Sequence, residues 1–468
     1  MPKVERDSWS GHVAFVLAAA ASAVGLGNLW RFPYLAAKYG GGVFIAVYLA
    51  LSLTVGVALL VTEIAIGRYS RQSQLTAFSA LGHRRWNALG AATAIAPLFI
   101  LPYYNVIGGW VLRYLADYAR VFAGAAPGAD ADGFFGAFIS APWAPFACMV
   151  VFTAASSAIV VCGVRNGIER ANMVLMPALL AITVALAAYV ATRPGSGAGI
   201  RYYLVPDFAS CGNLAKTVLA AMGQMFYSLS LAMGVMITYG SYMRRCDSIQ
   251  KASVRIVAAD TFMAFLSGLM IIPVVVTFAA ADGGGRPAID AGPGLMFVTL
   301  PKVFAALGPV GPWLGFAFFS LVLFAALTSA ISITEACVAS VCDFFRVRRP
   351  ASVAAVLVLT LAVGSLSAFG YGRWASFKPF GLPALEFFDS SMNVLMPVIA
   401  ALTCVFVGWA LGPRRILAEC RREAPKSSVG PVFAAGYVLM VRFVAPLLVL
   451  AILVSEVCRL FGLGGWSI

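Results

Sequence analysis

Two short stretches combine glycine with polar side chains inside long apolar runs. Residues 23–28 read AVGLGN, and residues 228–234 read SLSLAMG. Glycine is a poor helix former, and hydroxyl side chains compete for backbone hydrogen bonds. A helix broken here would expose amides and carbonyls that can bind an ion or a small polar ligand, provided that protein or a water-filled cavity covers them. Alternatively, the glycines serve close helix packing, and spacing alone does not decide between the two.

The elements that carry these stretches are predicted to be membrane helices. Of the 468 residues, 61% are hydrophobic and 11% are charged, whereas a soluble domain carries about 25% charged residues. The apolar runs have the length of roughly 20 residues that a helix needs to cross a bilayer, and they lack the alternation of barrel strands. We therefore predict an all-α polytopic membrane protein with eleven spans. Their limits are 12–38, 42–69, 88–121, 143–162, 169–191, 214–242, 250–279, 311–344, 351–370, 384–410 and 434–458.

The two interrupted stretches fall in the first and the sixth predicted span. This spacing is typical of two repeats of five helices that each begin with a broken helix. We expect a single domain over residues 1–468. It would contain a first five-helix repeat at 12–191, an inverted second repeat at 214–410 and an eleventh helix at 434–458.

Charge placement gives the orientation. The formal net charge is +14, and more than half of the 33 Lys and Arg residues fall in loops on one side of the predicted spans. Such loops are usually cytoplasmic, so we predict a cytoplasmic N-terminus and no nucleic-acid surface. The outside loops 122–142 and 280–310 are long enough to be structured lids, with a plain spacer as the alternative. The sequence has no CxxC, HExxH, GxSxG or GxxxxGK[ST] motif, which argues against a zinc site, these enzymes and an ATP-driven pump.

Six segments resemble the neurotransmitter:sodium symporter family, in that family's order. They are SAVGLGNLWRFPYLAAKYGGGVF at 22–44, GRYS at 67–70, PYYN at 102–105, GQMFYSLSLAMG at 223–234, ITYGSYM at 237–243 and ALTSAIS at 326–332. The chain is therefore identified as an eleven-span member, similar to the bacterial leucine transporter. The resemblance implies a transporter domain, not an enzyme, that imports an amino acid with sodium by alternating access across a bacterial inner (plasma) membrane. A sensor of the same fold that binds without flux is the alternative.

By this resemblance the chain binds two sodium ions, which as hard cations prefer oxygen ligands. The first site is expected to combine one carbonyl with three side-chain oxygens, from Ala23, Asn28, Ser228 and Asp260. The second is expected to combine three carbonyls with two hydroxyls, from Ala21, Val24, Ala325, Thr328 and Ser329. Taken alone, the two hydroxyls would be expected to serve helix packing or to bond carbonyls of their own helix, whereas AVGLGN opposite them favours the ion site. No organic cofactor is implied, and the expected assembly is a monomer or a weak oligomer.

Asp260 and Ala264 depart from the leucine-transporter pattern, which has Asn and Glu at these positions. Animal members that require chloride typically carry neutral residues at both. A carboxylate at position 260 could supply the negative charge that chloride otherwise brings. A sodium ion beside it would in turn make its burial physically reasonable. We therefore expect transport without chloride.

The substrate is expected to bind between the two breaks. The amides of Leu26 and Gly27 would begin a half-helix, whose partial positive charge suits a carboxylate, and the Tyr104 hydroxyl would donate to the same group. Gly25 stands where biogenic-amine members carry Asp, which favours an α-amino acid. A mostly apolar lining favours a neutral aliphatic or aromatic side chain. The full predicted set is Ala23, Gly25, Leu26, Gly27, Ile100, Tyr104, Tyr227, Ser228, Ser230, Met233, Ser329 and Ile333.

Two gates are expected on either side of this site. Outside, Arg31 would pair with an acid of the tenth span, either Asp389 or Glu386, unless it only snorkels toward the membrane surface. Inside, Arg6 would pair with an acid while two aromatic side chains seal around the pair. The inner set is Arg6, Trp9, Tyr242 and Asp343.

Two further features of the spans are noted. Glu63 is expected to hydrogen-bond the exposed backbone of the broken helices. Gly167 and Pro177 in the fifth span either allow local unwinding that admits water or form a simple proline kink.

Overall fold

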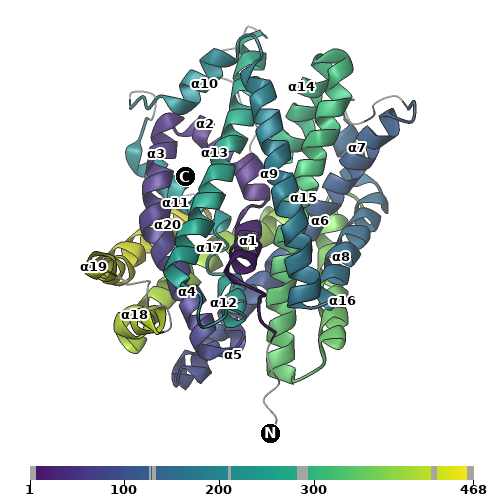
Figure 1. The fold of residues 1–468 in the computed structure, drawn as a ribbon. Coiled ribbons are helices and arrows are strands. Elements are labelled where there is room, and N and C mark those ends of the chain that lie inside the picture. Colours follow the sequence, from purple (N-terminus) through teal and green to yellow (C-terminus); the bar gives the residue numbers. More distant parts are fainter. Residues whose placement is uncertain are drawn as a thin grey trace.

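A computed structural model of the protein describes residues 7–125, 128, 133–208, 212–281, 293–422 and 430–460. Apart from an isolated bridge between Gly41 and Pro206, the regular structure in these ranges is helical. The α-helices of Figure 1 are α1 (His12–Ala23), α2 (Phe32–Lys38), α3 (Gly42–Leu51), α4 (Val57–Ser70), α5 (Gln74–Ala80), α6 (Asn87–Val121), α7 (Phe134–Ser140), α8 (Ala144–Val161), α9 (Arg170–Ala191), α10 (Ser196–Leu204), α11 (Leu214–Ser228), α12 (Val235–Ser241), α13 (Ile249–Ala281), α14 (Leu300–Ala306), α15 (Gly311–Phe345), α16 (Arg349–Ala368), α17 (Ala384–Val405), α18 (Pro413–Arg421), α19 (Pro431–Leu439) and α20 (Ala445–Leu460).

Short π-helical segments join several of these helices into longer spans. In the described part of the chain, nine continuous helical segments are long and apolar enough to cross a membrane. They are Gly42–Ser70, Arg84–Val121, Ala144–Val161, Val164–Ala191, Ile249–Val276, Gly308–Phe345, Arg349–Ala368, Ala384–Leu411 and Pro431–Arg459. The predicted all-α membrane fold is confirmed. The span limits agree within a few residues, although the fifth span begins at Val164 instead of residue 169.

The other two predicted spans are interrupted. The first consists of α1 and the segment Gly27–Lys38, which are bent by 55° relative to each other. The sixth consists of α11, with 15 residues, and α12, with 7, and neither is long enough to cross a membrane alone. The breaks fall at AVGLGN and SLSLAMG, the two stretches singled out in the sequence.

The break in the sixth span has strained backbone. Ser230 and Ala232 have φ values of 52° and 62°, in the left-handed region that costs free energy for residues with a Cβ, and Gly234 follows at 71°. Two contacts hold this segment: the Ser230 hydroxyl donates to the Ser22 carbonyl at 3.0 Å, and the Ala232 amide donates to the Glu63 carboxylate at 2.7 Å. The expected hydrogen bond from Glu63 to the broken helix is therefore present.

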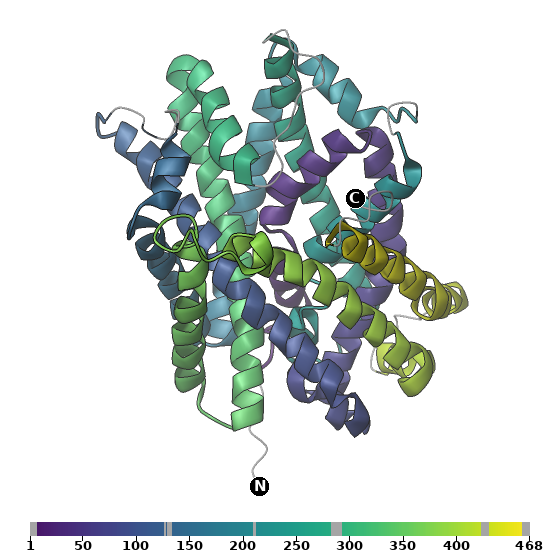
Figure 2. The ribbon, with the colours of Figure 1, turned by 180° about the vertical axis from the view of Figure 1, so that it is seen from behind.

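The broken helices lie inside the bundle. In Figure 1, α1 occupies the middle, and it packs against α13 and α15. Its sequence, HVAFVLAAAASA, is apolar almost all round, as expected for a helix enclosed by protein. In Figure 2 the last spans cross the opposite face obliquely, and α17 packs against α20 there. Outer helices instead expose apolar side chains, such as Val174 of α9 at 69%, as lipid-facing surfaces do.

Candidate functional site

A cavity of about 30 Å³ lies where the two breaks meet. All twelve predicted substrate residues line it, together with Ser22 and Asn28. They come from α1 and the following half-helix, from α6, from α11 and the break after it, and from α15. The structure thus brings the whole predicted set together. That the set binds a substrate stays a prediction.

The cavity offers hydrogen-bond donors to a ligand. The Tyr104 hydroxyl is fully enclosed beside the Leu26 amide and the Ser329 hydroxyl, and among the described residues it forms no hydrogen bond of good geometry. A buried hydroxyl without a partner carries a free-energy cost that a ligand could relieve. The half-helix that includes Leu26 and Gly27 starts at the same cavity, and its first amides lack helical acceptors. Together these donors could hold an anionic group such as a carboxylate.

Gly25 fits the cavity because it has no side chain. A Cβ at this position would stand 2.7 Å from the Ser329 hydroxyl oxygen and 3.4 Å from that of Tyr104. Real side chains do not approach so closely, so any larger residue here would displace the α15 wall. An aspartate at position 25 does not fit this packing.

Three oxygen-bearing side chains of the predicted first sodium site converge beside the cavity. The Ser228 hydroxyl lies 3.1 Å from Asn28 Oδ1 and 2.7 Å from Asp260 Oδ1. Asn28 Nδ2 also donates to Asp260 Oδ1, at 2.8 Å. All three residues are at most 2% exposed. A carboxylate, an amide oxygen and a hydroxyl gathered at one buried point suit a hard cation.

Tyr48 completes this cluster and was not among the predicted residues. Its hydroxyl donates to Asp260 Oδ2 at 2.9 Å, so both carboxylate oxygens are hydrogen-bonded. Gln224 was also missed, and its Nε2 donates to the Gly27 carbonyl at 3.1 Å. The available signal was a polar side chain inside an apolar run: a tyrosine in FIAVYLALS and a glutamine in GQMFYS.

The predicted second sodium site is built only from neutral groups. Helix α1 ends at Ala23, so the carbonyls of its last turn lack helical partners, and this end packs against α15. Ser329 donates to the Ser22 carbonyl at 3.3 Å across this contact, whereas Thr328 donates to Ala325 of its own helix at 3.0 Å. Four of the five predicted residues are 0% exposed, and Ser329 is 5% exposed. These four are Ala21, Val24, Ala325 and Thr328.

On the outer side, no ion pair joins Arg31 to an acid among the residues that the structure describes. Its guanidinium carbon lies 5.2 Å from the centre of the Tyr227 ring, and within the described ranges no ion pair joins it to Asp389. Asp389 instead accepts from Tyr103 at 3.3 Å, and the Tyr103 and Tyr227 hydroxyls are 3.2 Å apart. Glu386 is exposed and accepts a hydrogen bond from the Tyr371 hydroxyl at 3.4 Å. Asp389 is therefore the acid connected to the Arg31 region, through two tyrosines.

On the inner side, Trp9 closes the path below α1. It is 1% exposed, its indole donates to the Tyr239 carbonyl at 3.1 Å, and its amide donates to the Tyr242 carbonyl at 3.2 Å. The structure thus brings Trp9 and Tyr242 together as predicted. Arg6 lies outside the described residues, so its expected pairing is untested. Asp343 accepts from the Ser73 amide at 2.6 Å.

A buried ion pair supports this inner seal and was not predicted. Glu335 is 0% exposed and pairs with Arg349 at 2.5 Å, and it also accepts from the Tyr242 hydroxyl at 2.7 Å. An acid well inside a predicted span was the signal that could have found it. The fifth span, which contains Gly167 and Pro177, is a continuous helix. Glu169 of this span accepts a hydrogen bond from the Ser10 amide at 3.0 Å.

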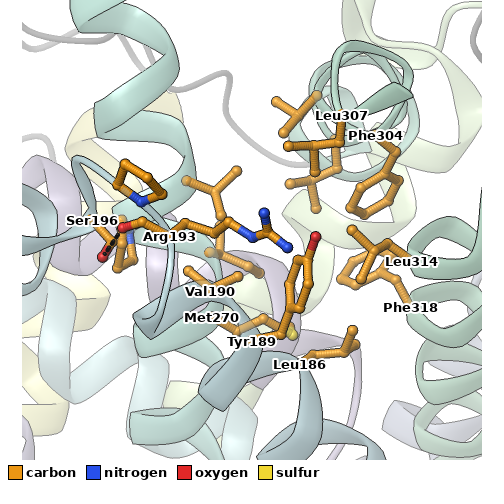
Figure 3. A pocket seen from close by; sticks show the side chains of 16 residues that line it. Leu186, Tyr189, Val190, Arg193, Ser196, Met270, Phe304, Leu307, Leu314 and Phe318 are labelled. Atoms are coloured by element: carbon orange, nitrogen blue, oxygen red, sulfur yellow. Dashed lines mark hydrogen bonds between the residues drawn. The ribbon is translucent and has the colours of Figure 1, made fainter. Parts of the chain in front are cut away.

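A larger cavity of about 310 Å³ lies elsewhere, between α9, α13, α14 and α15 (Figure 3). Leucine, valine and phenylalanine side chains form most of its wall. Its single charged side chain, Arg193, stacks on the Tyr189 ring at 4.0 Å. It contains neither a helix break nor an acid. The cavity at the breaks therefore remains the better candidate for a polar ligand.

Comparisons with known proteins agree with this architecture. The chain matches the sodium:neurotransmitter symporter family over residues 6–122 and 139–464. It is 33% identical to the sodium-dependent transporter YhdH of Bacillus subtilis, over 96% of this chain and 97% of the relative. A sodium-dependent transporter of Haemophilus influenzae is 30% identical, over 97% and 98% of the two chains.

The fold comparison gives the same family. The crystal structure of MhsT in complex with L-phenylalanine is 34% identical and superposes with a TM-score of 0.84, covering 96% of this chain and 100% of that one. The human sodium- and chloride-dependent creatine transporter 1 is more distant, at 24% identity over 88% of this chain and 71% of the relative. The chain belongs to the sodium:neurotransmitter symporter family and is a sodium-dependent, multi-pass membrane transporter.

Proposed function

We propose that this transporter imports a neutral, hydrophobic amino acid together with two sodium ions, without chloride. One observation carries the proposal. The buried Tyr104 hydroxyl and the start of the half-helix after Gly25 share one cavity with Asn28 and Ser228, which are hydrogen-bonded to Asp260. An α-amino acid has a carboxylate for the donors, and that carboxylate can also ligate a cation at the oxygen cluster. Ion and substrate would then bind cooperatively.

The substrate class follows from the lining. Ile100, Met233 and Ile333 supply apolar surface around the predicted side-chain space, and Met adapts its shape readily. The crowded position of Gly25 leaves no room for the acid that would pair with an amine lacking a carboxylate. MhsT, which is 34% identical, was crystallised with L-phenylalanine. With about 30 Å³ free in this conformation, an aliphatic or aromatic side chain requires the lining to move.

Chloride independence rests on Asp260. The carboxylate is buried, and Asn28, Ser228 and Tyr48 all donate to it. A buried carboxylate with three donors carries its negative charge at moderate cost, and a sodium ion beside it offsets that charge. A mobile anion is then not needed.

The transport cycle is alternating access. The inner path is sealed at Trp9, whereas on the outside Arg31 and Asp389 are not joined. This combination fits a form closed to the cytoplasm, in which the cavity lining still has to move to admit a substrate from the outside. Loading would draw Arg31 toward Asp389, after which the Trp9 contacts break and the second sodium ion leaves to the cytoplasm. The membrane potential contributes about 2.3 kcal/mol per charge per 100 mV. The N-terminus lies in the cytoplasm of a bacterial cell in this proposal.

The test is thermal unfolding of the purified protein against the twenty amino acids, in sodium and in choline. We expect stabilisation by aliphatic or aromatic amino acids that requires sodium. Uptake into proteoliposomes should then follow a sodium gradient with or without chloride. Stabilisation only by charged amino acids or amines would overturn the substrate class. Sodium-dependent binding without any uptake would identify a sensor of the same fold.

A further inference from the structure

Helix α18 has two unlike sides. Pro413, Ile416, Leu417, Glu419 and Cys420 are buried against the rest of the protein. The opposite side is basic and exposed. It carries Arg414, Arg415, Arg421 and Arg422. Such a helix is typical of an element that lies along a membrane surface.

The buried side fixes α18 firmly in place. Glu419 forms an ion pair with Arg68 of α4 at 2.8 Å, and both residues are nearly inaccessible to solvent. Arg68 also donates to the carbonyls of Glu419 and Asp247, the latter at 2.6 Å. The arginines on the outer side of α18 are therefore presented from a rigid support.

A groove of about 650 Å³ runs between α18 and the eleventh span. Arg414 and Arg421 line it from α18. They are seven residues apart, two helical turns, and so lie on one face at a spacing of roughly 10 Å. The facing wall is apolar and comes from α19 and the residues just after it. It includes Ala434, Ala435, Val438 and Phe443.

The two groove arginines are available for an anionic ligand. In the described part of the chain, neither Arg414 nor Arg421 forms an ion pair, whereas Arg422 lies 3.8 Å from Glu419. The apolar wall belongs to a membrane span and continues into exposed side chains such as Phe443, which is 54% exposed. The groove thus joins a basic end at the membrane surface to an apolar end within the membrane.

We propose that this groove binds an anionic phospholipid. The phosphate group lies between Arg414 and Arg421, because guanidinium groups bind phosphate through paired, charge-assisted hydrogen bonds. An acyl chain lies along Ala435, Val438 and Phe443. A free phosphate would leave this apolar wall unused, and a zwitterionic lipid brings a second positive charge beside the arginines. Basic pockets beside membrane helices are suited to acidic headgroups.

The chain offers a matched control for the test. Arg414→Gln/Arg421→Gln and Arg415→Gln/Arg422→Gln remove the same charge from the same helix, but only the first pair lines the groove. The full-length protein in neutral detergent is titrated with dioctanoyl phosphatidylglycerol, and binding is followed by native mass spectrometry. Dioctanoyl phosphatidylcholine and glycerol 1-phosphate serve as comparison ligands. Thermal unfolding without lipid checks that each variant is folded.

We expect phosphatidylglycerol to bind the unmodified chain and the Arg415→Gln/Arg422→Gln chain equally. The groove variant should bind about thirtyfold more weakly, because each arginine near an anionic lipid contributes roughly fivefold. Ala435→Trp fills the groove without changing charge and should also weaken phosphatidylglycerol binding. Equal weakening by both arginine pairs would overturn the proposal, since it indicates diffuse attraction. Phosphatidylcholine or glycerol 1-phosphate binding as tightly as phosphatidylglycerol would overturn it as well.

Discussion

The two proposed sodium sites both border the break in the first span but differ in charge. The first contains the buried carboxylate of Asp260, and the second contains only carbonyls and hydroxyls. Cation affinity rises with the number of charged ligands and with the rigidity of the site. The hydrogen bonds to Asp260 make the first cluster rigid, whereas Thr328 is bonded only within its own helix. We infer that the first site retains its ion more tightly and that the second empties first.

Replacing Asp260 with Asn should have the largest effect, because it removes the charge that distinguishes the two sites. Removing one partner of a buried charge pair costs about 3–5 kcal/mol, so the sodium concentration for half-maximal uptake should rise between about 150-fold and a few thousandfold. Added chloride should restore part of the affinity in this variant and change nothing in the unmodified protein. Uptake by the unmodified protein is measured in proteoliposomes with and without chloride. If it requires chloride, the Asp260 carboxylate does not supply the negative charge of the first site. Asp260→Asn/Ala264→Glu, which returns a carboxylate one helical turn away, should remove the chloride effect.

Replacing Tyr104 with Phe tests the link between the first site and the substrate. A hydrogen bond to a charged group contributes about 1.5–3 kcal/mol, so amino-acid affinity should fall between about tenfold and a hundredfold. Sodium binding without amino acid should not change, because in our proposal Tyr104 contacts the substrate carboxylate and not the ion. Tyr114→Phe is the control, since its hydroxyl donates to the Phe297 carbonyl away from the cavity. Amino-acid affinity is measured by binding titration. An equal loss of affinity in Tyr104→Phe and Tyr114→Phe would show that the Tyr104 hydroxyl does not bind the substrate and that both changes act through the packing of the bundle.

Replacing Thr328 with Val removes one neutral oxygen from the second site and retains the shape of the side chain. The loss of one hydroxyl ligand corresponds to about 1–1.5 kcal/mol, or roughly tenfold in sodium affinity. Chloride should give no rescue, unlike in Asp260→Asn. Thr334→Val on the same helix is the matched control, because its hydroxyl is buried and has no partner in the structure. Chloride rescue of Thr328→Val would mean that the two sites are not distinguished by charge.

Replacing Tyr48 with Phe should have the smallest effect. Its hydroxyl does not reach the ion in our proposal but holds the second oxygen of Asp260, at 2.9 Å. Losing this bond should weaken sodium binding by about twofold to fivefold. Tyr437→Phe, whose hydroxyl is bonded to Thr62, serves as the comparison. The sodium affinity of both variants is measured by thermal unfolding at increasing sodium concentration. A loss in Tyr48→Phe as large as that in Asp260→Asn would indicate that Tyr48 binds the ion directly.

The spans and the breaks could be predicted because their signals are local. A run of about 20 apolar residues must become a helix in lipid, and AVGLGN or SLSLAMG interrupts such a run. The cross-chain contacts had no local signal. Nothing around Tyr48 indicates that it bonds a residue 212 positions away, and nothing at Ser230 or Ala232 favours a positive φ. Arg31 is a further example. Its charge led us to expect an acidic partner, whereas in the structure its guanidinium group packs on the Tyr227 ring.

The buried pair of Arg68 and Glu419 also bears on biogenesis. The two residues are separated by 351 positions in the chain. At a synthesis rate of 5–20 residues per second, the arginine waits roughly 20 to 70 s before its partner exists. During that time it must remain in contact with water or lipid headgroups at the end of the second span. A chain that stops before residue 419 would keep this cation without its acid partner, which is costly at the edge of the membrane.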